Sequence, residues 1–292
     1  MEAIAGRDAP AAVVTGVSTG IGNGILHELI RAGYRVFGSV RKREDAERLS
    51  KELGDACTPL VFDVTDAAGV ANGAELVRQA LGTVKLAGLV NNAGVAVLGP
   101  LLELPVSELR RQIEVNLVSV LAVTQAFFPL LRKASDGGRR PARIVNISSV
   151  GGHIALPFLG QYAASKHGLE GLSDSLRREC MLYGVDVVVI DPATIATPMW
   201  RKGLDLDLSV YSKSPYYPSM NRMKDTMIAY GRRGSPPELI GRRVVKILGA
   251  RKPRARYTSG KGKTVIWMTR HLVNTRLVDR IFAKTLGLRG GG

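Results

Sequence analysis

The sequence contains little cysteine, and this scarcity excludes several kinds of site. Only Cys57 and Cys180 occur among the 292 residues, far apart and without metal-ligand spacing around either. A disulfide framework or a zinc site is therefore not expected, and no metal ligands are assigned. Free thiols fit a reducing compartment, so the sequence predicts a cytoplasmic protein.

Long apolar runs are missing as well. No stretch reaches the roughly 20 apolar residues that a membrane-spanning helix needs, so none is predicted. Residues 1–10 carry acids and no apolar core, so no signal peptide is expected. A hydrophobic fraction of 45% and a charged fraction of 23% are those of an ordinary globular protein.

Acidic residues are scarce near the C-terminus. Sixteen Lys and Arg face only Glu238 and Asp279 over residues 232–292, whereas the other residues hold twenty-five basic and twenty-three acidic side chains. The formal net charge of +16 is thus mainly a C-terminal feature. No recognition motif accompanies it and few aromatic residues lie among the cations, so no specific nucleic-acid binding is expected.

Strand-like and helix-like segments alternate along most of the chain. Near-continuous apolar runs predict strands at residues 11–15, 34–40, 59–62, 86–90, 143–147 and 185–190. Helical spacing predicts helices at residues 21–32, 44–53, 66–81, 106–133 and 161–183. The alternation predicts an α/β fold: a single domain with a doubly wound parallel sheet and helices on both faces.

A glycine-rich turn follows the first predicted strand. Gly16, Gly20 and Gly22 have the spacing G-x-x-x-G-x-G. Glycines permit a sharp turn and let the backbone approach a pyrophosphate at a helix N-terminus. A tight turn without a ligand is the alternative, because such a loop is weak evidence by itself.

The end of the second predicted strand bears on the choice of cofactor. Folds selective for NAD place an acid there for the ribose 2′-hydroxyl, whereas arginine accommodates a 2′-phosphate. This strand runs into Arg41-Lys42-Arg43, with no acid before Glu44. The pattern favours NADP(H) over NAD(H), with Arg41 at the phosphate and a further hydroxyl contact from Ser18. A solvated basic turn is the alternative.

Tyr162 and Lys166 have a spacing that suits proton transfer. They are four residues apart in a helical segment, so they share one face of the helix. A phenol has a pKa of about 10, and a nearby ammonium lowers it toward neutral pH. Ser149 follows the predicted strand 143–147, at the sheet edge where α/β folds bind ligands, and its hydroxyl could hold a substrate oxygen.

Together these motifs resemble the classical short-chain dehydrogenase/reductase family over roughly residues 10–200, and the pattern is similar to hydroxysteroid- and retinol-dehydrogenase-like members. Residues 15–22 resemble its T-G-x-x-x-G-I-G loop, and residues 91–94 match its N-N-A-G motif. The resemblance implies a Rossmann-type fold and an enzyme that interconverts an alcohol and a ketone or aldehyde by hydride transfer.

The resemblance also implies roles for individual residues. Tyr162 would act as acid or base, within the tetrad Asn116, Ser149, Tyr162 and Lys166. The implied cofactor contacts are Gly16, Ser18, Thr19, Gly20, Ile21, Gly22, Arg41, Asp63, Val64, Asn92, Ala93, Gly94, Tyr162, Lys166, Pro192 and Thr197. One departure is Ala193, which stands where the family usually has glycine, so the geometry at the nicotinamide edge is left open.

An apolar lid is expected at about residues 194–235, which are rich in methionine and tyrosine. It favours a bulky hydrophobic alcohol or carbonyl substrate. Candidate substrate contacts are His153, Leu156, Met199 and Trp200. Ordinary lid packing is the alternative, and His153 fits a surface or pocket-wall residue better than a catalyst.

Residues 261–292 are expected to form a basic extension of a catalytic domain at residues 1–260. Cations alternate there with an apolar stripe at helical spacing, made of Val273, Leu277, Val278, Ile281, Phe282 and Leu286. Packing of this helix on the domain or across a dimer is favoured, and contact with an anionic membrane surface is the alternative. The resemblance implies a homodimer or homotetramer formed through residues 106–133 and 161–183.

Two functions from other classes compete with an enzyme. The first is a cofactor-binding regulator without useful catalysis, against which the presence of both Tyr162 and Lys166 speaks. The second is a membrane-surface or nucleic-acid binder that uses the basic C-terminal segment.

Overall fold

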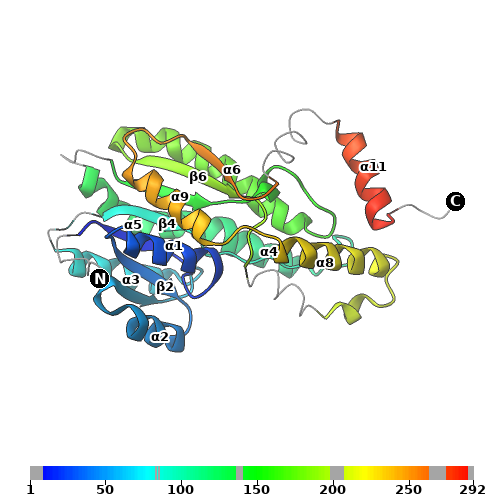
Figure 1. Cartoon of the computed structure of the whole chain (residues 1–292), viewed down its shortest axis with the longest axis horizontal. Coiled ribbons are helices and arrows are strands. Elements are labelled where there is room, and N and C mark those ends of the chain that lie inside the picture. Colours follow the sequence, from blue (N-terminus) through cyan, green and yellow to red (C-terminus); the bar gives the residue numbers. More distant parts are fainter. Residues whose placement is uncertain are drawn as a thin grey trace.

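The computed structural model describes residues 9–82, 84, 86–135, 141–197, 207–262 and 274–288. A seven-stranded sheet forms the centre, in the order β3-β2-β1-β4-β5-β6-β7, and every neighbouring pair is parallel. Helices cover both faces of this sheet (Figure 1). The predicted doubly wound α/β fold is therefore confirmed.

The strands lie close to their predicted positions. Their bounds are β1 Ala11–Val14, β2 Arg35–Val40, β3 Cys57–Val61, β4 Leu86–Asn91, β5 Arg143–Ile147, β6 Asp186–Pro192 and β7 Arg256–Ser259. The sequence did not predict β7, whose four residues Arg-Tyr-Thr-Ser lack an apolar run. Among the described residues it pairs only with β6, and Arg256 lies opposite Val189.

The helices are α1 Gly20–Arg31, α2 Arg43–Leu53, α3 Ala67–Leu81, α4 Val106–Ile113, α5 Ser119–Ser135, α6 Gly160–Glu179, α8 Tyr217–Arg232, α9 Glu238–Gly249 and α11 Thr275–Leu286. The single helix predicted at 106–133 is divided by a π-helical turn, Glu114–Val118. The helix predicted at 161–183 ends in a 3-10 turn, Cys180–Tyr183. Neither α8 nor α9 was predicted.

Alternate side chains of each central strand enter different cores. Ala11 and Val13 of β1 pack with α3 and α5, whereas Ala12 and Val14 pack with α1 and α9. All four are fully buried, because helices cover both faces of the sheet. This burial explains why the strands read as continuous apolar runs.

The two cysteines lie in different cores. Cys57 belongs to the core that contains α1 and α9, and Cys180 to the core that contains α3 and α5. Both are buried free thiols. The sheet separates them, so the prediction that they form no disulfide is confirmed.

One helical stretch contradicts the expectation that no segment is long and apolar enough to span a membrane. Val106–Arg132 has 27 residues and a mean hydropathy of 1.6 in its most apolar window, which suffices by length and composition. However, α5 within it packs on β4 and α3, and its Phe127 and Leu131 are fully buried. A core helix passes the same test, so this stretch is weak evidence for a membrane span.

The strand order determines where the ligand crevice lies. Strand β1 lies between β2 and β4, so the chain winds outward from β1 in both directions. Ligands of such sheets bind beyond the carboxyl ends of the strands where the winding reverses. The predicted site residues that follow β1, β4 and β5 therefore meet at one edge.

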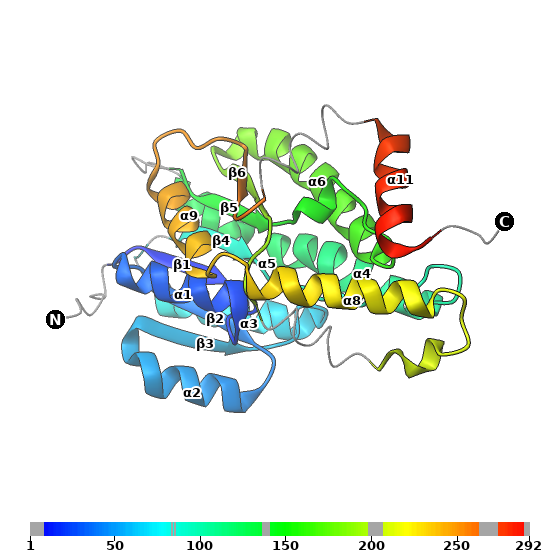
Figure 2. The ribbon, with the colours of Figure 1, turned by 45° about the vertical axis from the view of Figure 1, so that its right-hand side comes forward.

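Helix α11 lies beyond the sheet. In Figures 1 and 2 it stands at the far end of the molecule from the N-terminus, next to α8. The Arg222 side chain on α8 donates from Nε to the Leu286 carbonyl oxygen at 2.9 Å. Leu286 is buried, so the end of α11 is fixed against α8.

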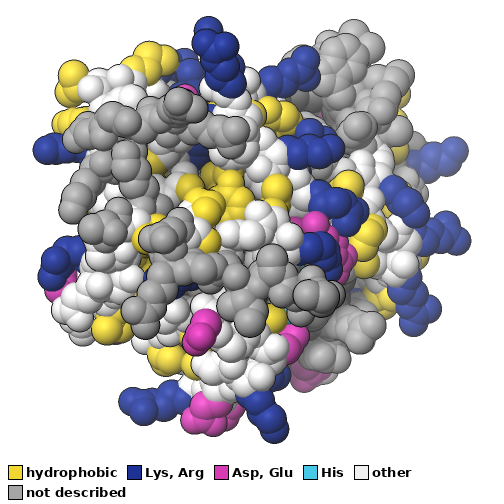
Figure 3. Space-filling model, turned by 60° about the vertical axis from the view of Figure 1, so that its left-hand side comes forward, with side chains coloured by type: hydrophobic (Ala, Val, Ile, Leu, Met, Phe, Trp, Pro, Cys, Tyr) yellow, Lys and Arg dark blue, Asp and Glu magenta, His cyan; other side chains and the backbone are white. Residues whose placement is uncertain are grey.

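Basic side chains are widely scattered. On the face that Figure 3 shows, apolar side chains gather near the centre, and Lys and Arg side chains lie on its right-hand half and at its edges.

Candidate active site

The glycine turn between β1 and α1 has little spare space. Gly16 and Gly20 have φ values of 72° and 63°, which favour glycine. A Cβ at Gly22 would overlap the Gly16 carbonyl oxygen and lie 2.5 Å from Nδ2 of Asn92. These positions therefore need glycine for conformation or for close backbone approach.

The N-terminus of α1 is open to an anion. Thr19 at the N-cap makes no side-chain cap hydrogen bond, and the first turn contains no acid. Thr19 is exposed, Ser18 is half-buried, and Ile21 packs against the core beneath. The N–H groups of the first turn and the positive end of the helix dipole thus face the crevice.

The segment after β4 is tied to this turn. The Thr15 hydroxyl oxygen accepts from the backbone N–H groups of Asn92 at 2.9 Å and Ala93 at 3.0 Å. The Asn92 amide donates to the carbonyl oxygens of Thr15 and Gly16 at 2.9 and 3.1 Å. Asn91 instead donates to Asn146 on β5 at 2.9 Å, inside the sheet. Asn92 therefore shapes the crevice, and Asn91 stabilises the sheet.

Two further strand ends border the crevice. Arg41 directly follows β2 and is exposed, and the Ser39 hydroxyl just before it accepts from the Gly16 N–H at 3.1 Å. After β3, the Asp63 carboxylate accepts from the backbone N–H and the hydroxyl of Thr65 at 3.0 and 2.8 Å. Val64 is buried. Arg41 and Asp63 thus follow neighbouring strands.

Ser149, Tyr162 and Lys166 come together beyond β5. A Cβ at Gly151 would lie 3.1 Å from Cε1 of Tyr162 and 3.4 Å from Oγ of Ser149, so both border this glycine. Lys166 Nζ lies 5.9 Å from the centre of the Tyr162 ring and donates to the Ile147 carbonyl oxygen at 2.9 Å. The spacing on α6 therefore places the ammonium one turn below the phenol.

Burial dominates the electrostatics of this pair. It raises the pKa of Tyr162, and a hydrogen bond with the Ser149 side chain acts against this. Burial also lowers the pKa of Lys166 to about 8, and the charges of Glu170 and Asp191 oppose this. The surroundings of Tyr162 therefore raise its pKa, contrary to the lowering expected from the nearby ammonium.

Asn116 lies in the π-helical turn and is fully buried. Its Oδ1 accepts from the Val95 N–H at 2.8 Å, and its Nδ2 donates to the Val95 carbonyl oxygen at 2.9 Å and to the Ser165 hydroxyl at 3.0 Å. A Cβ at Gly94 would lie 3.2 Å from Oδ1 of Asn116 and 3.9 Å from Nζ of Lys166. Asn116 thus connects the segment after β4 to α6.

The last expected cofactor contacts follow β6. Pro192 and Ala193 are buried, and the Ala193 N–H donates to the Ser259 carbonyl oxygen on β7 at 2.8 Å. The segment after β6 is therefore tied to the end of β7. Thr197 is half-buried at the end of the described segment.

An apolar cluster adjoins Tyr162. Leu156 packs in it, together with the end of α11 and several side chains of the expected lid: Tyr211, Tyr216, Tyr217, Met220, Met223 and Met227. Phe158 holds a φ of 66°, unusual for a bulky residue, and packs edge-on against Tyr216. The candidate contacts Met199 and Trp200 lie outside the described residues.

His153 is not where a substrate contact is expected. Its ring is 7% exposed, and Nε2 lies 3.1 Å from the Asp191 carboxylate and 3.9 Å from that of Glu170. Because the ring lies among buried carboxylates, the structure favours an internal role for His153.

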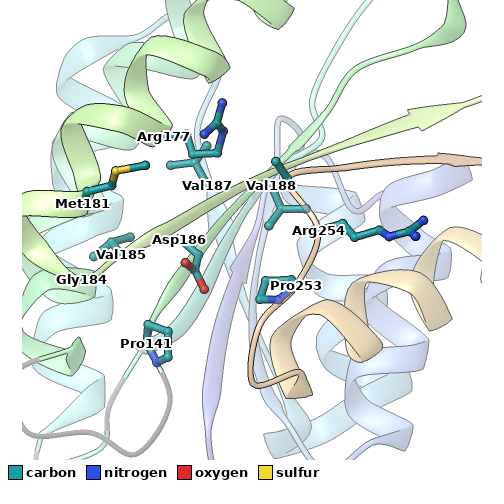
Figure 4. Close-up of a pocket in the computed structure, with 11 residues that line it drawn as sticks. Pro141, Arg177, Met181, Gly184, Val185, Asp186, Val187, Val188, Pro253 and Arg254 are labelled. Carbon is teal, nitrogen blue, oxygen red and sulfur yellow. The ribbon is translucent and has the colours of Figure 1, made fainter.

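A hollow of about 450 Å³ lies away from these residues (Figure 4). It is lined by Met181, Asp186 and Arg254 among others, near the amino ends of β5 and β6. Tyr162 and Ser149 lie at the carboxyl ends, so this hollow is not the reaction site.

Several polar residues of the site were not predicted. Thr15, Ser39 and Ser165 act through hydroxyl contacts that have no sequence periodicity. Glu170 could have been predicted to lie next to Lys166, because it follows that residue by four positions in a helical segment.

Comparison with known proteins identifies relatives. A family model described as short chain dehydrogenase matches residues 10–205. The NADPH-dependent 3-dehydrocapnine reductase of Ornithobacterium rhinotracheale is 38% identical over 275 residues, covering 94% of this chain and 96% of that protein. Retinol dehydrogenase 5 of Mus musculus is 32% identical over 282 residues, covering 92% and 86%.

Solved structures share the fold. A short-chain dehydrogenase from Streptomyces avermitilis superposes with a TM-score of 0.74 at 24% identity, covering 94% of each chain. The Pseudomonas aeruginosa RhlG/NADP active-site complex superposes with a TM-score of 0.69 at 30% identity, covering 87% of this chain and 96% of that one.

Proposed function

Because this chain belongs to the short-chain dehydrogenase family, we propose that it is an NADP(H)-dependent oxidoreductase that interconverts an alcohol and a ketone or aldehyde on a bulky hydrophobic substrate. The observation that carries the proposal is the junction of Tyr162, Ser149 and the buried Lys166 at the crevice edge of the sheet.

The crevice fits a dinucleotide. Gly22 lets the turn between β1 and α1 close tightly against Gly16 and Asn92, and the uncapped N-terminus of α1 suits a pyrophosphate. We assign the cofactor contacts to the residues expected from the sequence, from Gly16 through Thr197. A bound nicotinamide would supply or accept the hydride.

The protein's own residues would move the proton. Tyr162 donates it to the carbonyl oxygen during reduction and takes it back during oxidation. Ser149 donates a hydrogen bond to the same oxygen, and the positive charge of Lys166 favours the phenolate. Asn116 holds the segment around Val95 and Ser165 in place beside Lys166.

The apolar cluster next to Tyr162 supports a bulky apolar substrate. The relative of Ornithobacterium is named for 3-dehydrocapnine and another relative for retinol, so both compound classes belong in the test. The test measures NADPH consumption with 3-dehydrocapnine, steroid, retinoid and short aliphatic carbonyls. Turnover of a bulky apolar compound supports the proposal. Tight NADPH binding with no turnover of any compound would favour a regulator.

Arg41 is expected to select NADPH. In Arg41→Asp the cation that faces a 2′-phosphate becomes an anion, so kcat/KM for NADPH should fall at least about 10-fold relative to that for NADH. Parallel kinetics with both cofactors measure this ratio. Lys51→Asp makes the same charge change on an exposed residue at the far end of α2 and should leave the ratio unchanged. An unaltered ratio in Arg41→Asp would assign selectivity to other residues.

We further propose a cytoplasmic homodimer or homotetramer that forms through α4, α5 and α6. Exposed apolar side chains on and beside these helices support such contacts, including Leu102, Val106 and Val118.

Helix α11 is proposed to touch an anionic membrane surface. Leu286 and Phe282 pack toward α8, but Leu277 and Ile281 are 49% and 53% exposed beside several cations. Leu277→Glu/Ile281→Glu should therefore abolish sedimentation with anionic vesicles. Val210→Glu, another exposed site, is the control. Equal sedimentation of both variants would exclude α11 from membrane contact.

A further inference from the structure

A row of ionisable side chains extends past the catalytic pair. Tyr162, Lys166, Glu170 and Asp174 follow one another at intervals of four on α6, so they share one face of the helix. The proposed proton transfer uses only the first two. Glu170 is nonetheless buried, one turn beyond Lys166. A buried carboxylate is costly unless it is paired, so its surroundings matter.

Three elements supply those surroundings. Arg256 on β7 donates from Nε to Oε2 of Glu170 at 2.9 Å, and the same nitrogen lies 3.8 Å from Oδ2 of Asp191 on β6. His153, from the loop after β5, approaches Asp191 at 3.1 Å and Glu170 at 3.9 Å. The side chain of Asp191 is fully buried. We call His153, Glu170, Asp191 and Arg256 the acid cluster.

The charges of the acid cluster do not cancel internally. Burial and the nearby charge of Asp191 raise the pKa of Glu170, and Arg256 opposes this. Once Glu170 and Asp191 are both ionised, two carboxylates face one guanidinium, so one negative charge remains among these three groups. The outer carboxylate, Asp174, is 38% exposed and pairs with Arg177 at 3.2 Å; it also lies 3.7 Å from Arg256, but its exposure to solvent weakens its effect inside the cluster. The remaining charge lies on the side of Lys166, whose ammonium is itself buried.

A buried ammonium needs this partner. Lys166 donates to the Ile147 carbonyl oxygen, but this acceptor carries no net charge. The charges of Glu170 and Asp191 oppose the lowering of the Lys166 pKa by burial. Without them, burial would favour neutral Lys166 at working pH, and a neutral amine does not favour the Tyr162 phenolate.

We propose that the acid cluster is a positioning site for the reaction: its residual negative charge holds Lys166 in the ammonium form beside Tyr162. This inference rests on the proposed function of Tyr162 and Lys166. His153 donates to the Asp191 carboxylate from Nε2 and keeps that carboxylate facing inward. No residue of the acid cluster needs to touch substrate.

A bound divalent cation is a different use of the same atoms. His153, Glu170 and Asp191 each have one ligand atom within 4.8 Å of the others. Arg256 already supplies a positive charge to Glu170, and a metal ion would repel it. The charge-balance role is therefore favoured.

The test removes charge without changing shape. Glu170→Gln should shift the acidic limb of the pH profile for alcohol oxidation upward by about one pH unit, because Lys166 then loses its proton more easily. Asp191→Asn should shift it in the same direction. Glu179→Gln, which removes an exposed carboxylate at the end of α6, is the matched control and should leave the limb in place.

A double variant separates charge from architecture. Glu170→Gln/Arg256→Gln leaves one negative charge, on Asp191, so the limb should return toward its wild-type position. A purely structural cluster predicts the opposite, a greater loss than in either single variant. Thermal unfolding of each variant identifies any that fail to fold.

A second readout needs no substrate. The tyrosinate absorbance of Tyr162 is obtained during a pH titration by subtracting the spectrum of Tyr162→Phe. The midpoint of this titration should shift in the same direction as the acidic limb of the pH profile. This titration still tests the acid cluster if the wild type turns over none of the tested carbonyls. Such a lack of turnover would contradict the proposed function alone. If the titration midpoint stays at its wild-type pH in both Glu170→Gln and Asp191→Asn, the acid cluster proposal is overturned. Activity lost on chelation and restored by Zn²⁺ or Mn²⁺ overturns it in favour of a metal site.

Discussion

Tyr162→Phe is expected to lower kcat by about 10²- to 10⁴-fold in both directions, the range for losing a positioned acid–base group. Only the hydroxyl is removed, and the ring keeps its packing in the apolar cluster beside α6. The affinity for NADPH should therefore stay close to that of the wild type. Steady-state kinetics with the best carbonyl and a fluorescence titration with NADPH measure the two effects.

Tyr230→Phe is the matched control for this experiment. It removes the same atom from a side chain on α8 that is 60% exposed. It should leave kcat unchanged. If Tyr162→Phe retained more than about a tenth of the wild-type kcat, another group would have to transfer the proton.

Gly22→Ala is expected to weaken NADPH binding by at least about 10-fold, or about 1.4 kcal/mol. The added methyl has no free space between the Gly16 carbonyl and the Asn92 amide, which are hydrogen-bonded at 3.1 Å. The turn must therefore open, and its N–H groups move away from the pyrophosphate. Titration with NADPH measures the loss.

Gly171→Ala makes the same substitution on α6 at a position with no neighbouring atom within 4 Å. It should bind NADPH normally and raise stability slightly, because alanine favours a helix by about 0.5–1 kcal/mol over glycine. Thermal unfolding of both variants separates lost binding from lost folding. Wild-type affinity in Gly22→Ala would contradict the assignment of this turn.

The sequence predicted the sheet well because its strands are buried on both sides. A residue such as Val13 enters one core and Val14 the other, so both must be apolar. Such runs stand out against polar helices such as α2. The glycine turn and the pair Tyr162 and Lys166 were also visible, because each is a short-range pattern.

Other elements depend on contacts that a local pattern does not contain. Strand β7 is polar and is fixed by its pairing with β6, for example between Arg256 and Val189. Helix α9 packs closely on α1 through Gly24 and Gly241, and no periodicity predicts this contact. The π-helical turn around Asn116 depends on the segment after β4, to which that amide is bonded.

The position of His153 shows a further limit of the sequence. Tyr162 is thirteen positions after Ser149, and His153 lies between them, which suggested a substrate contact. Its partner Asp191 is 38 residues further along the chain and reaches it only because β5 and β6 are adjacent. Burial of both side chains then decides where the imidazole lies.

The burial of both thiols makes the protein convenient for site-specific labelling. Burial raises the pKa of Cys57 to about 12 and also raises that of Cys180, so neither forms a thiolate readily. A cysteine introduced at Arg276, whose side chain is 88% exposed, would therefore react first with a maleimide probe. Fluorescent or spin labels can thus be attached to α11 in the otherwise native chain, and their mobility would report vesicle binding directly.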